Sequence, residues 1–210
     1  MIELETFKNI PIENSVLQNL MSNYKFPRNK VSALEKRGQI IRLKKGLYVV
    51  SGKISRKTLS RELIANHLYG PSYISFETAL AFYGLIPEKV FAMRSATFKR
   101  AIRFENVVGI FEYITVPKKY YSIGITQQIV DNEYTYLIAT PEKALCDLIL
   151  ATPNLRLQSV KAMSIYLEES LRIDFSDWQN IDMEVIKQCI EMGRKKGELE
   201  LLLKLLRKVN

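Results

Sequence analysis

The sequence predicts an α+β fold: an N-terminal winged helix-turn-helix followed by a helix pair, an antiparallel β-sheet and C-terminal helices. Three observations support this fold class. Apolar residues recur at helical spacing near both ends of the chain, and β-branched and aromatic residues dominate from about residue 90 to residue 138. A glycine turn also separates two short strands after residue 38. We therefore expect a winged-helix domain over 1–55 and an α+β domain over 56–210.

The first predicted helix runs over about 12–23. Its apolar face holds Ile12, Val16, Leu17, Leu20 and Met21. Residues 2–9 form a short segment with no clear apolar pattern. The first of the three helices usual in a winged helix-turn-helix domain is therefore only weakly indicated.

A second helix is predicted to open at Pro27, because proline suits the first helical position. Val31 and Leu34 form its apolar stripe, and Gly38 is a natural terminator. Residues 39–43, the turn Lys44-Lys45-Gly46 and residues 47–50 then predict a β-hairpin with lysines at its tip.

Beyond the hairpin the pattern changes from helix to strand and back to helix. Helices are expected over 57–69 and from Ser75 to Gly84, followed by four to six antiparallel strands over 90–138. A further helix opens at Thr140-Pro141 and runs to about Ala151. The last three predicted helices lie near 157–171, 182–193 and 195–208.

The positive charge is concentrated in the N-terminal segment. The net charge is +9, and residues 1–60 hold 12 basic and 4 acidic residues, a balance of +8. Residues 61–210 hold 19 basic and 18 acidic residues, a balance of +1. A basic field confined to one small segment suits binding to the phosphate backbone of double-stranded DNA. A merely solubilising surface is the alternative, but it does not explain the confinement.

The predicted second helix is the candidate reader of the DNA major groove. Its solvent face should carry the small, polar and cationic residues Arg28, Asn29, Lys30, Ser32, Ala33 and Lys36. At the hairpin tip, Lys44 and Lys45 are expected to reach phosphate or an adjacent minor groove, with Arg42 and Lys53 beside them. An exposed lysine-rich helix without a DNA role would contain the same residue types.

Three segments resemble one known family. The run Lys36-Arg37-Gly38-Gln39-Ile40-Ile41-Arg42-Leu43-Lys44-Lys45-Gly46-Leu47-Tyr48-Val49 resembles the wing of the AbiEi-type antitoxins. These are transcriptional regulators of abortive-infection (type IV) toxin–antitoxin operons, a form of phage defence. Residues 73–85 (YISFETALAFYGL) and 139–148 (ATPEKALCDL) resemble two further segments of that family in the same order. The resemblance covers residues 12–150.

The resemblance implies what the two domains do. The N-terminal domain would bind the operator of its own operon as a transcriptional autorepressor. The C-terminal domain would oppose a nucleotidyltransferase-like toxin as its functional partner, with or without a stable complex. The sequence favours no particular oligomeric state.

Enzyme chemistry is not predicted, and neither a cofactor nor a metal is expected. The single histidine, His67, is interpreted as structural, and Cys146 and Cys189 as reduced core residues, so no zinc cluster is indicated. There is no phosphate-binding glycine loop and no G-x-S-x-G motif. Glu142 and Asp147 are assigned to a helix N-terminus and a polar helix face.

Two alternatives stay open. A DNA-targeted nuclease or modification-associated protein could use carboxylates with a lysine, and the candidates by residue type are Glu77, Glu105, Glu112 and Lys118. An interaction module could dock a protein partner or RNA through the basic helix 195–208. The first ten residues lack the apolar segment of a signal peptide, and no stretch approaches the ~18 apolar residues of a membrane span. We therefore expect no membrane association and a cytoplasmic protein.

Overall fold

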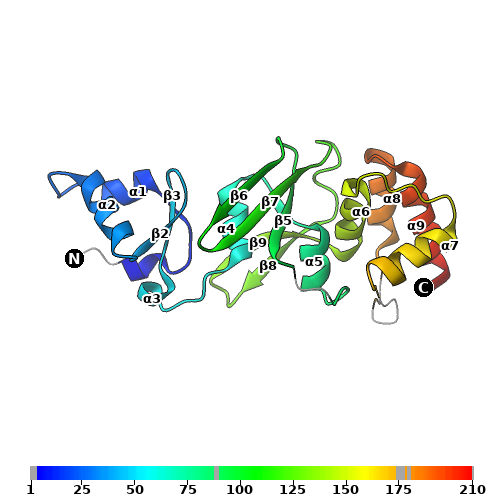
Figure 1. Cartoon of the computed structure of the whole chain (residues 1–210), viewed down its shortest axis with the longest axis horizontal. Helices are drawn as coiled ribbons and strands as arrows, with labels where there is room; N and C mark the ends of the chain where they lie inside the picture. The colour runs from blue at the N-terminus through cyan, green and yellow to red at the C-terminus, as the bar shows by residue number, and fades with distance from the viewer. Residues whose placement is uncertain (1–3, 88–89, 174–177, 179–180, 210) are drawn as a thin grey trace.

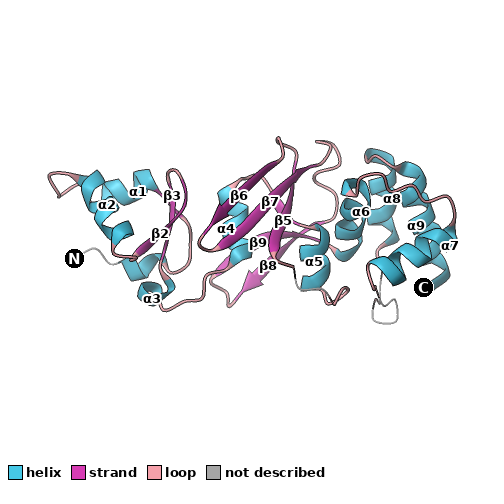
Figure 2. Ribbon diagram, viewed as in Figure 1, coloured by secondary structure: helices cyan, strands magenta, loops and turns pink. Residues whose placement is uncertain are grey.

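We describe the computed structural model over residues 4–87, 90–173, 178 and 181–209. It has a mixed α+β architecture, as predicted, in three parts that follow one another along an elongated molecule (Figure 1). An N-terminal unit stands at one end, a β-sheet lies in the middle, and a group of helices occupies the other end (Figure 2). The two termini therefore lie far apart.

The N-terminal unit combines short helices with a small sheet. Its elements are the 3-10 helix η1 (Leu4–Phe7), β1 (Ile12–Glu13), α1 (Asn14–Leu20), α2 (Pro27–Lys36), β2 (Ile40–Lys44), β3 (Leu47–Val50) and the short helix α3 (Gly52–Ser55). The three strands are antiparallel and ordered β1-β3-β2.

Helix α1 is shorter than the predicted helix over 12–23. Ile12 lies in a strand and pairs with Tyr48, so the helix begins only at Asn14. Leu17 and Met21 are fully buried, whereas Val16 and Leu20 are 42% and 43% exposed. The wide apolar stripe of the prediction is therefore wrong, because only one edge of this two-turn helix faces the core.

Helix α2 confirms the prediction made for Pro27. The proline occupies the first turn, the helix ends at Lys36, and Gly38 follows with φ +66°, a left-handed conformation that glycine adopts readily. Val31 and Leu34 are buried in a cluster with Leu17 and Met21.

The hairpin β2–β3 turns at Lys45-Gly46, where Gly46 has φ +85°. All four residues of β3 are buried, because the hairpin packs on both faces. Tyr48 and Val50 belong to the N-terminal cluster, whereas Leu47 and Val49 belong to the large central core. The hairpin is thus shared between two cores and is not a free-standing wing.

The central sheet contains β4 (Tyr73–Ile74), β5 (Ala92–Thr97), β6 (Ile102–Asn106), β7 (Gly109–Thr115), β8 (Ile125–Val130) and β9 (Tyr134–Ala139), in the order β6-β7-β5-β4-β9-β8. The expectation of an antiparallel sheet is wrong. The pairs β6–β7, β8–β9 and β4–β5 are antiparallel, but β5 pairs in parallel with β7, and β4 with β9. Turn residues in the sequence identify antiparallel hairpins between consecutive strands. The two parallel pairs join strands that are not consecutive in the chain, so no turn residue indicates them.

Helices α4 (Arg61–Leu68) and α5 (Phe76–Phe82) pack on the sheet, and the helices that follow them fill the far end of the molecule (Figure 1). The latter are α6 (Pro141–Ala151), α7 (Val160–Ile165) with a π-helical turn at Tyr166–Ser170, α8 (Met183–Met192) and α9 (Lys196–Val209). The helix predicted from residue 57 begins at Arg61, because the Ser60 hydroxyl accepts a hydrogen bond from the Leu63 N–H at 3.1 Å. Helix α6 begins at Pro141 behind the predicted Thr140 cap.

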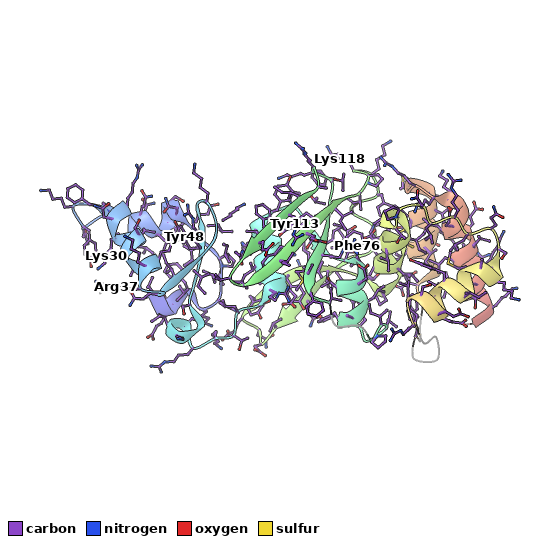
Figure 3. All side chains as sticks on the ribbon, viewed as in Figure 1. Lys30, Arg37, Tyr48, Phe76, Tyr113 and Lys118 are labelled. Atoms are coloured by element: carbon purple, nitrogen blue, oxygen red, sulfur yellow. The ribbon has the colours of Figure 1, made fainter. Side chains whose placement is uncertain are left out.

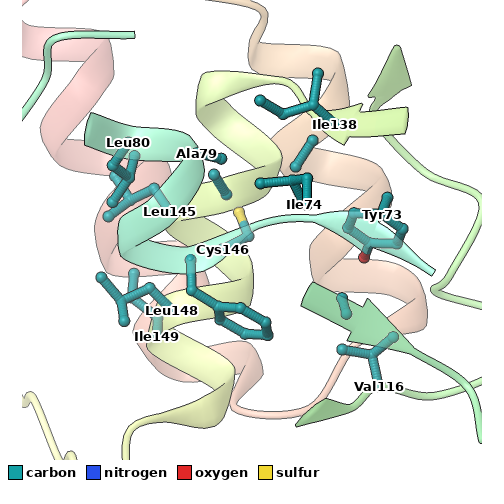
Figure 4. Packing of buried hydrophobic residues seen from close by; sticks show 14 of the residues in the cluster. Tyr73, Ile74, Ala79, Leu80, Val116, Ile138, Leu145, Cys146, Leu148 and Ile149 are labelled. Atoms are coloured by element: carbon teal, nitrogen blue, oxygen red, sulfur yellow. The ribbon is translucent and has the colours of Figure 1, made fainter. Parts of the chain in front are cut away.

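The main core joins the sheet to the C-terminal helices. Figure 4 shows Ala79 and Leu80 of α5 beside Leu145 and Cys146 of α6. Cys146 and Cys189 are both buried and free, as predicted. Helix α9 buries Leu199, Leu202, Leu205 and Leu206 within the same core. The apolar face of α9 is therefore covered by the rest of the protein. If α9 docks a protein partner or RNA, as the interaction-module alternative supposes, only its polar face is available.

Across the described residues, no helix combines the length and the apolar character needed to cross a membrane.

Candidate nucleic-acid interface

Helix α2 presents a polar face to solvent. Arg28, Ser32 and Lys36 are spaced by four residues and are all exposed, so they form one stripe along the helix. Asn29 is exposed beside them, while Lys30 and Ala33 are half-buried. The Lys30 ammonium lies 4.9 Å from the centre of the Tyr24 ring. All six residues predicted for the reading face thus have solvent access, and four of them are exposed.

The positive charge of this face is not neutralised by neighbours. Among the described residues, no ion pair includes Arg28, Lys30 or Lys36. The only acidic residue of α2 is Glu35, which is half-buried. The positive end of the helix dipole adds to the field at the first turn, where Arg28 lies. This face is therefore suited to bind an anionic backbone.

The hairpin tip separates the two lysines predicted to act together. Lys45 is exposed at the turn, and Arg42 is exposed on β2. Lys44 instead donates a hydrogen bond to the Leu68 carbonyl oxygen at 2.5 Å and lies 5.9 Å from the Phe104 ring centre. Lys44 is predicted to reach phosphate or a minor groove together with Lys45, but its ammonium is bonded to Leu68, because the inner face of the hairpin packs on the sheet domain.

Lys53 does not lie beside the hairpin tip, where the prediction places it. It lies on α3, which follows the end of β3 that is opposite the tip (Figure 1). It is exposed but does not flank Lys45.

The two hairpin lysines should behave differently when they are replaced. Lys45→Ala is expected to weaken binding to any DNA sequence and to reduce the slope of log affinity against log salt by about 0.9, one released counterion. Lys44→Ala should leave that slope unchanged and lower the free energy of unfolding by about 1 kcal/mol, because it loses a partly buried hydrogen bond. Salt titrations by fluorescence anisotropy and urea unfolding measure the two effects. Equal slopes for Lys45→Ala and wild type would count against a DNA role for the tip.

Polar contacts hold the N-terminal unit against the sheet. The Asn106 side chain donates to the Leu43 carbonyl oxygen at 3.0 Å. Lys8 and Lys57 both pair with Glu133, at 2.9 Å and 3.0 Å, and their hydrogen bonds lower the pKa of that carboxyl. These contacts fix the direction in which α2 and the hairpin face.

The carboxylates considered for a nuclease do not gather with Lys118. Glu77 and Glu112 both pair with Arg94, whose guanidinium lies between them. Glu105 pairs with Arg103, and Lys118 lies over the Phe98 ring. The part of the chain that the structure describes contains no cluster of three metal-ligating side chains. His67, interpreted as structural, is exposed on α4.

A buried polar cluster was missed by the sequence interpretation. The Tyr73 and Ser75 hydroxyls donate to Asp147 Oδ2 at 2.9 Å and 2.6 Å, and Lys143 Nζ lies 3.2 Å from Asp147 Oδ1. Lys143 also donates to the Tyr120 carbonyl oxygen at 3.0 Å. Burial and the Asp147 charge hold the pKa of Tyr73 well above its usual value, so this hydroxyl remains a donor.

Asp147 is therefore fully buried and does not lie on a polar helix face as predicted. Glu142 is buried as well, and its carboxylate accepts a hydrogen bond from the Asp182 N–H at 3.2 Å. Ser75 stands at the start of α5 as predicted, but its hydroxyl bonds to Asp147 and does not cap the helix. The only local signal was the four-residue spacing of Lys143 and Asp147, which surface ion pairs share.

Comparison with known proteins gives a fold neighbour. No family model matches the chain, and no curated protein matches it. Among solved structures, the chain is similar to the crystal structure of the RV2827C protein from Mycobacterium tuberculosis, with a TM-score of 0.52 and 10% sequence identity. The likeness covers 96% of this chain and 78% of that chain. At this identity it shows a shared fold that includes all three parts of the molecule.

Proposed function

We propose that the chain is a sequence-specific, double-stranded-DNA-binding transcriptional autorepressor, in which α2 reads the major groove. The observation that carries the proposal is the exposed stripe of Arg28, Ser32 and Lys36, flanked by Asn29 and free of ion pairs among the described residues. Arginine and asparagine are the side chains that most often bond guanine and adenine edges.

The arrangement of the N-terminal elements supports the same function. In the winged-helix interpretation, α1 and α2 form the helix-turn-helix and β2–β3 the wing. Strand β1 pairs with β3 and closes the small sheet behind them. The first helix would be reduced to the single turn η1. In this interpretation the exposed face of α2 would meet the major groove, and the exposed Lys45 would contact the DNA backbone.

We further propose an antitoxin role, in the cytoplasm, opposite a nucleotidyltransferase-like toxin. This part rests on the AbiEi-type resemblance. Two of the three segments that resemble the family, 73–85 and 139–148, are brought together by the hydrogen bonds from Tyr73 and Ser75 to Asp147. Tyr73, Ser75 and Asp147, which lie in these two segments, are thus buried inside the C-terminal domain.

Replacing Asn29 tests the reading role of α2. Asn29→Ala is expected to keep the melting temperature and the affinity for scrambled DNA, because Asn29 is exposed and uncharged. It should reduce the preference for the upstream region of its own gene by about 1–3 kcal/mol, the value of one bidentate base contact. The measurement is competition binding with both duplexes.

Gln188→Ala, which removes an exposed amide from the distant helix α8, is the matched control and should discriminate as wild type does. If Asn29→Ala, Arg28→Ala and Lys30→Ala all discriminate as well as wild type, α2 is not the reader.

A further inference from the structure

A second basic cluster lies at one edge of the central sheet. Because β5 and β7 run parallel, the loops that follow them leave the sheet at the same end. The Val116 N–H donates to the Thr97 carbonyl oxygen at 2.8 Å, and the Thr115 hydroxyl donates to the Lys99 carbonyl oxygen at 2.8 Å. Two segments that are distant in the chain are thereby joined.

These loops carry exposed cations. The sheet-edge cluster, as we call it, consists of Lys99, Arg100, Lys118, Lys119 and Arg194. Arg194 joins it from the turn between α8 and α9, where it lines a small pocket together with Val116 and Pro117. Figure 3 shows Lys118 projecting from this edge.

The charge of the cluster is uncompensated. Within the described ranges, none of its five residues forms an ion pair. The acidic residues on the adjoining strands are already paired, Glu105 with Arg103 and Glu112 with Arg94. The cluster is therefore a local positive surface within a segment whose overall charge is nearly balanced.

Two cation–aromatic contacts and one contact between aromatic rings link this cluster to the hairpin. The Lys44 ammonium lies 5.9 Å from the Phe104 ring, the Phe104 ring lies 6.1 Å from the Tyr69 ring, and the Tyr69 ring lies 5.5 Å from the Lys99 ammonium. The two ammonium groups are thus at most about 18 Å apart, roughly half of one helical turn of B-DNA. Lys44 and Lys99 are themselves bonded to carbonyl oxygens, but their separation brings the hairpin and the sheet edge within reach of one duplex.

The contacts along this path favour a double-stranded partner. Lys44 and Lys99 are fixed by hydrogen bonds to the Leu68 and Gly70 carbonyl oxygens. The aromatic rings pack edge-on against one another, Phe104 on Tyr113 and Phe98 on Tyr121, and are half-buried or buried. They do not offer the open faces on which the bases of single strands stack. The free groups at this edge are positive charges, which suit backbone phosphate.

We propose that the sheet-edge cluster is a second DNA contact, which binds backbone phosphates of the duplex flanking the segment read by α2. The inference rests on the proposed function, because α2 sets the register on the DNA. The cluster adds affinity that is independent of sequence, since phosphate contacts position a protein without reading bases. The DNA footprint then extends beyond the N-terminal unit.

The test uses the full chain and two duplexes. One duplex carries the upstream recognition segment with about two helical turns of DNA on either side, and the other is trimmed to the segment alone. The test variant is Arg100→Ala/Lys118→Ala/Lys119→Ala. The matched control, Lys161→Ala/Lys204→Ala/Arg207→Ala, removes three exposed cations from α7 and α9.

With the long duplex, the sheet-edge variant should lose about tenfold or more in affinity at 0.15 M salt, and its salt slope should fall by up to about 2.7. With the short duplex it should bind as wild type does. The control variant should match wild type on both.

Wild-type affinity and slope for the sheet-edge variant on the long duplex would overturn this inference and leave the proposed function intact. Equal losses on both duplexes would also overturn it, because the contact would then not be to flanking DNA. Unchanged DNA binding with loss of a protein or RNA partner would contradict it as well. Failure of wild type to bind either duplex would remove the proposed function and this inference together.

Discussion

Asp147→Ala is expected to lower the free energy of unfolding by about 3–5 kcal/mol, because it leaves the Lys143 ammonium buried without its counter-charge. Both side chains of this pair are fully buried. The Tyr73 and Ser75 hydroxyls also lose their common acceptor. Since these residues join β4, the start of α5 and α6, the loss should loosen the connection between the sheet and the C-terminal helices. Urea unfolding followed by circular dichroism measures the change.

Two control variants separate the buried charge from an ordinary ion pair. Lys187→Ala breaks the exposed pair Lys187–Glu184 on α8 and should cost less than about 1 kcal/mol. The double variant Lys143→Met/Asp147→Leu removes both buried charges and should recover much of the stability lost in Asp147→Ala. If Asp147→Ala costs no more than Lys187→Ala, the buried cluster does not hold these elements together.

The second large effect is expected from the cations of α2. The variant Arg28→Ala/Lys30→Ala/Lys36→Ala removes three positive charges from the proposed DNA face while leaving the buried Val31 and Leu34 in place. If each lost charge-assisted contact is worth about 1 kcal/mol or more, affinity for the upstream region should fall at least about 100-fold. The slope of log affinity against log salt should fall by up to about 2.7. Anisotropy titrations at several salt concentrations measure both.

None of the three residues is in an ion pair among the described residues. Lys30→Ala removes the contact with the exposed Tyr24 ring, worth about 0.5–1 kcal/mol at such a site, so the folded state of this α2 variant should lose little stability. The variant Lys161→Ala/Lys204→Ala/Arg207→Ala, which removes the same charge from other surfaces, should bind DNA as wild type does. A comparable loss in both variants would mean that net charge, and not α2, governs binding.

Deleting residues 1–57 is a poor substitute for these variants. Leu43, Leu47 and Val49 of the hairpin are part of the central core. Removing them would expose the apolar surface that they cover, so loss of DNA binding could follow from misfolding. The domain boundary expected at residue 55 remains a prediction, and limited proteolysis of the full chain would test it.

Local signals in the sequence were sufficient for some elements. Pro27 with Gly38, and Thr140 with Pro141, define the bounds of α2 and the start of α6 through backbone and capping chemistry within one turn. The uninterrupted apolar run Leu47-Tyr48-Val49-Val50 is typical of a strand buried on both faces, a signal that the prediction of a lysine-tipped hairpin did not use.

Other features depend on contacts between distant segments. The parallel pairing of β5 with β7 leaves no local pattern. Lys143 and Asp147 have the spacing of a surface ion pair and are buried only because β4 and α5 cover them. Lys99 and Lys118 lie on two loops that hydrogen bonds join at one edge of the sheet. Acidic residues elsewhere cancel their charge when the net charge is summed over residues 61–210. Likewise, Lys44 is held by a hydrogen bond that it donates to the carbonyl oxygen of Leu68, which lies on another element.

Competition binding of the full chain is the most direct test of the proposal that α2 reads DNA. The upstream region of its own gene competes with a scrambled duplex of equal length and composition. Wild type and Arg28→Ala/Lys30→Ala/Lys36→Ala are compared at salt concentrations from about 0.05 to about 0.2 M, a range over which counterion release changes affinity strongly. We predict that wild type prefers the upstream region by about 1,000-fold or more. The α2 variant should bind that region at least about 100-fold more weakly, with a salt slope reduced by up to about 2.7. Equal binding of wild type to the two duplexes, or equal binding of wild type and the α2 variant to the upstream region, would contradict the account.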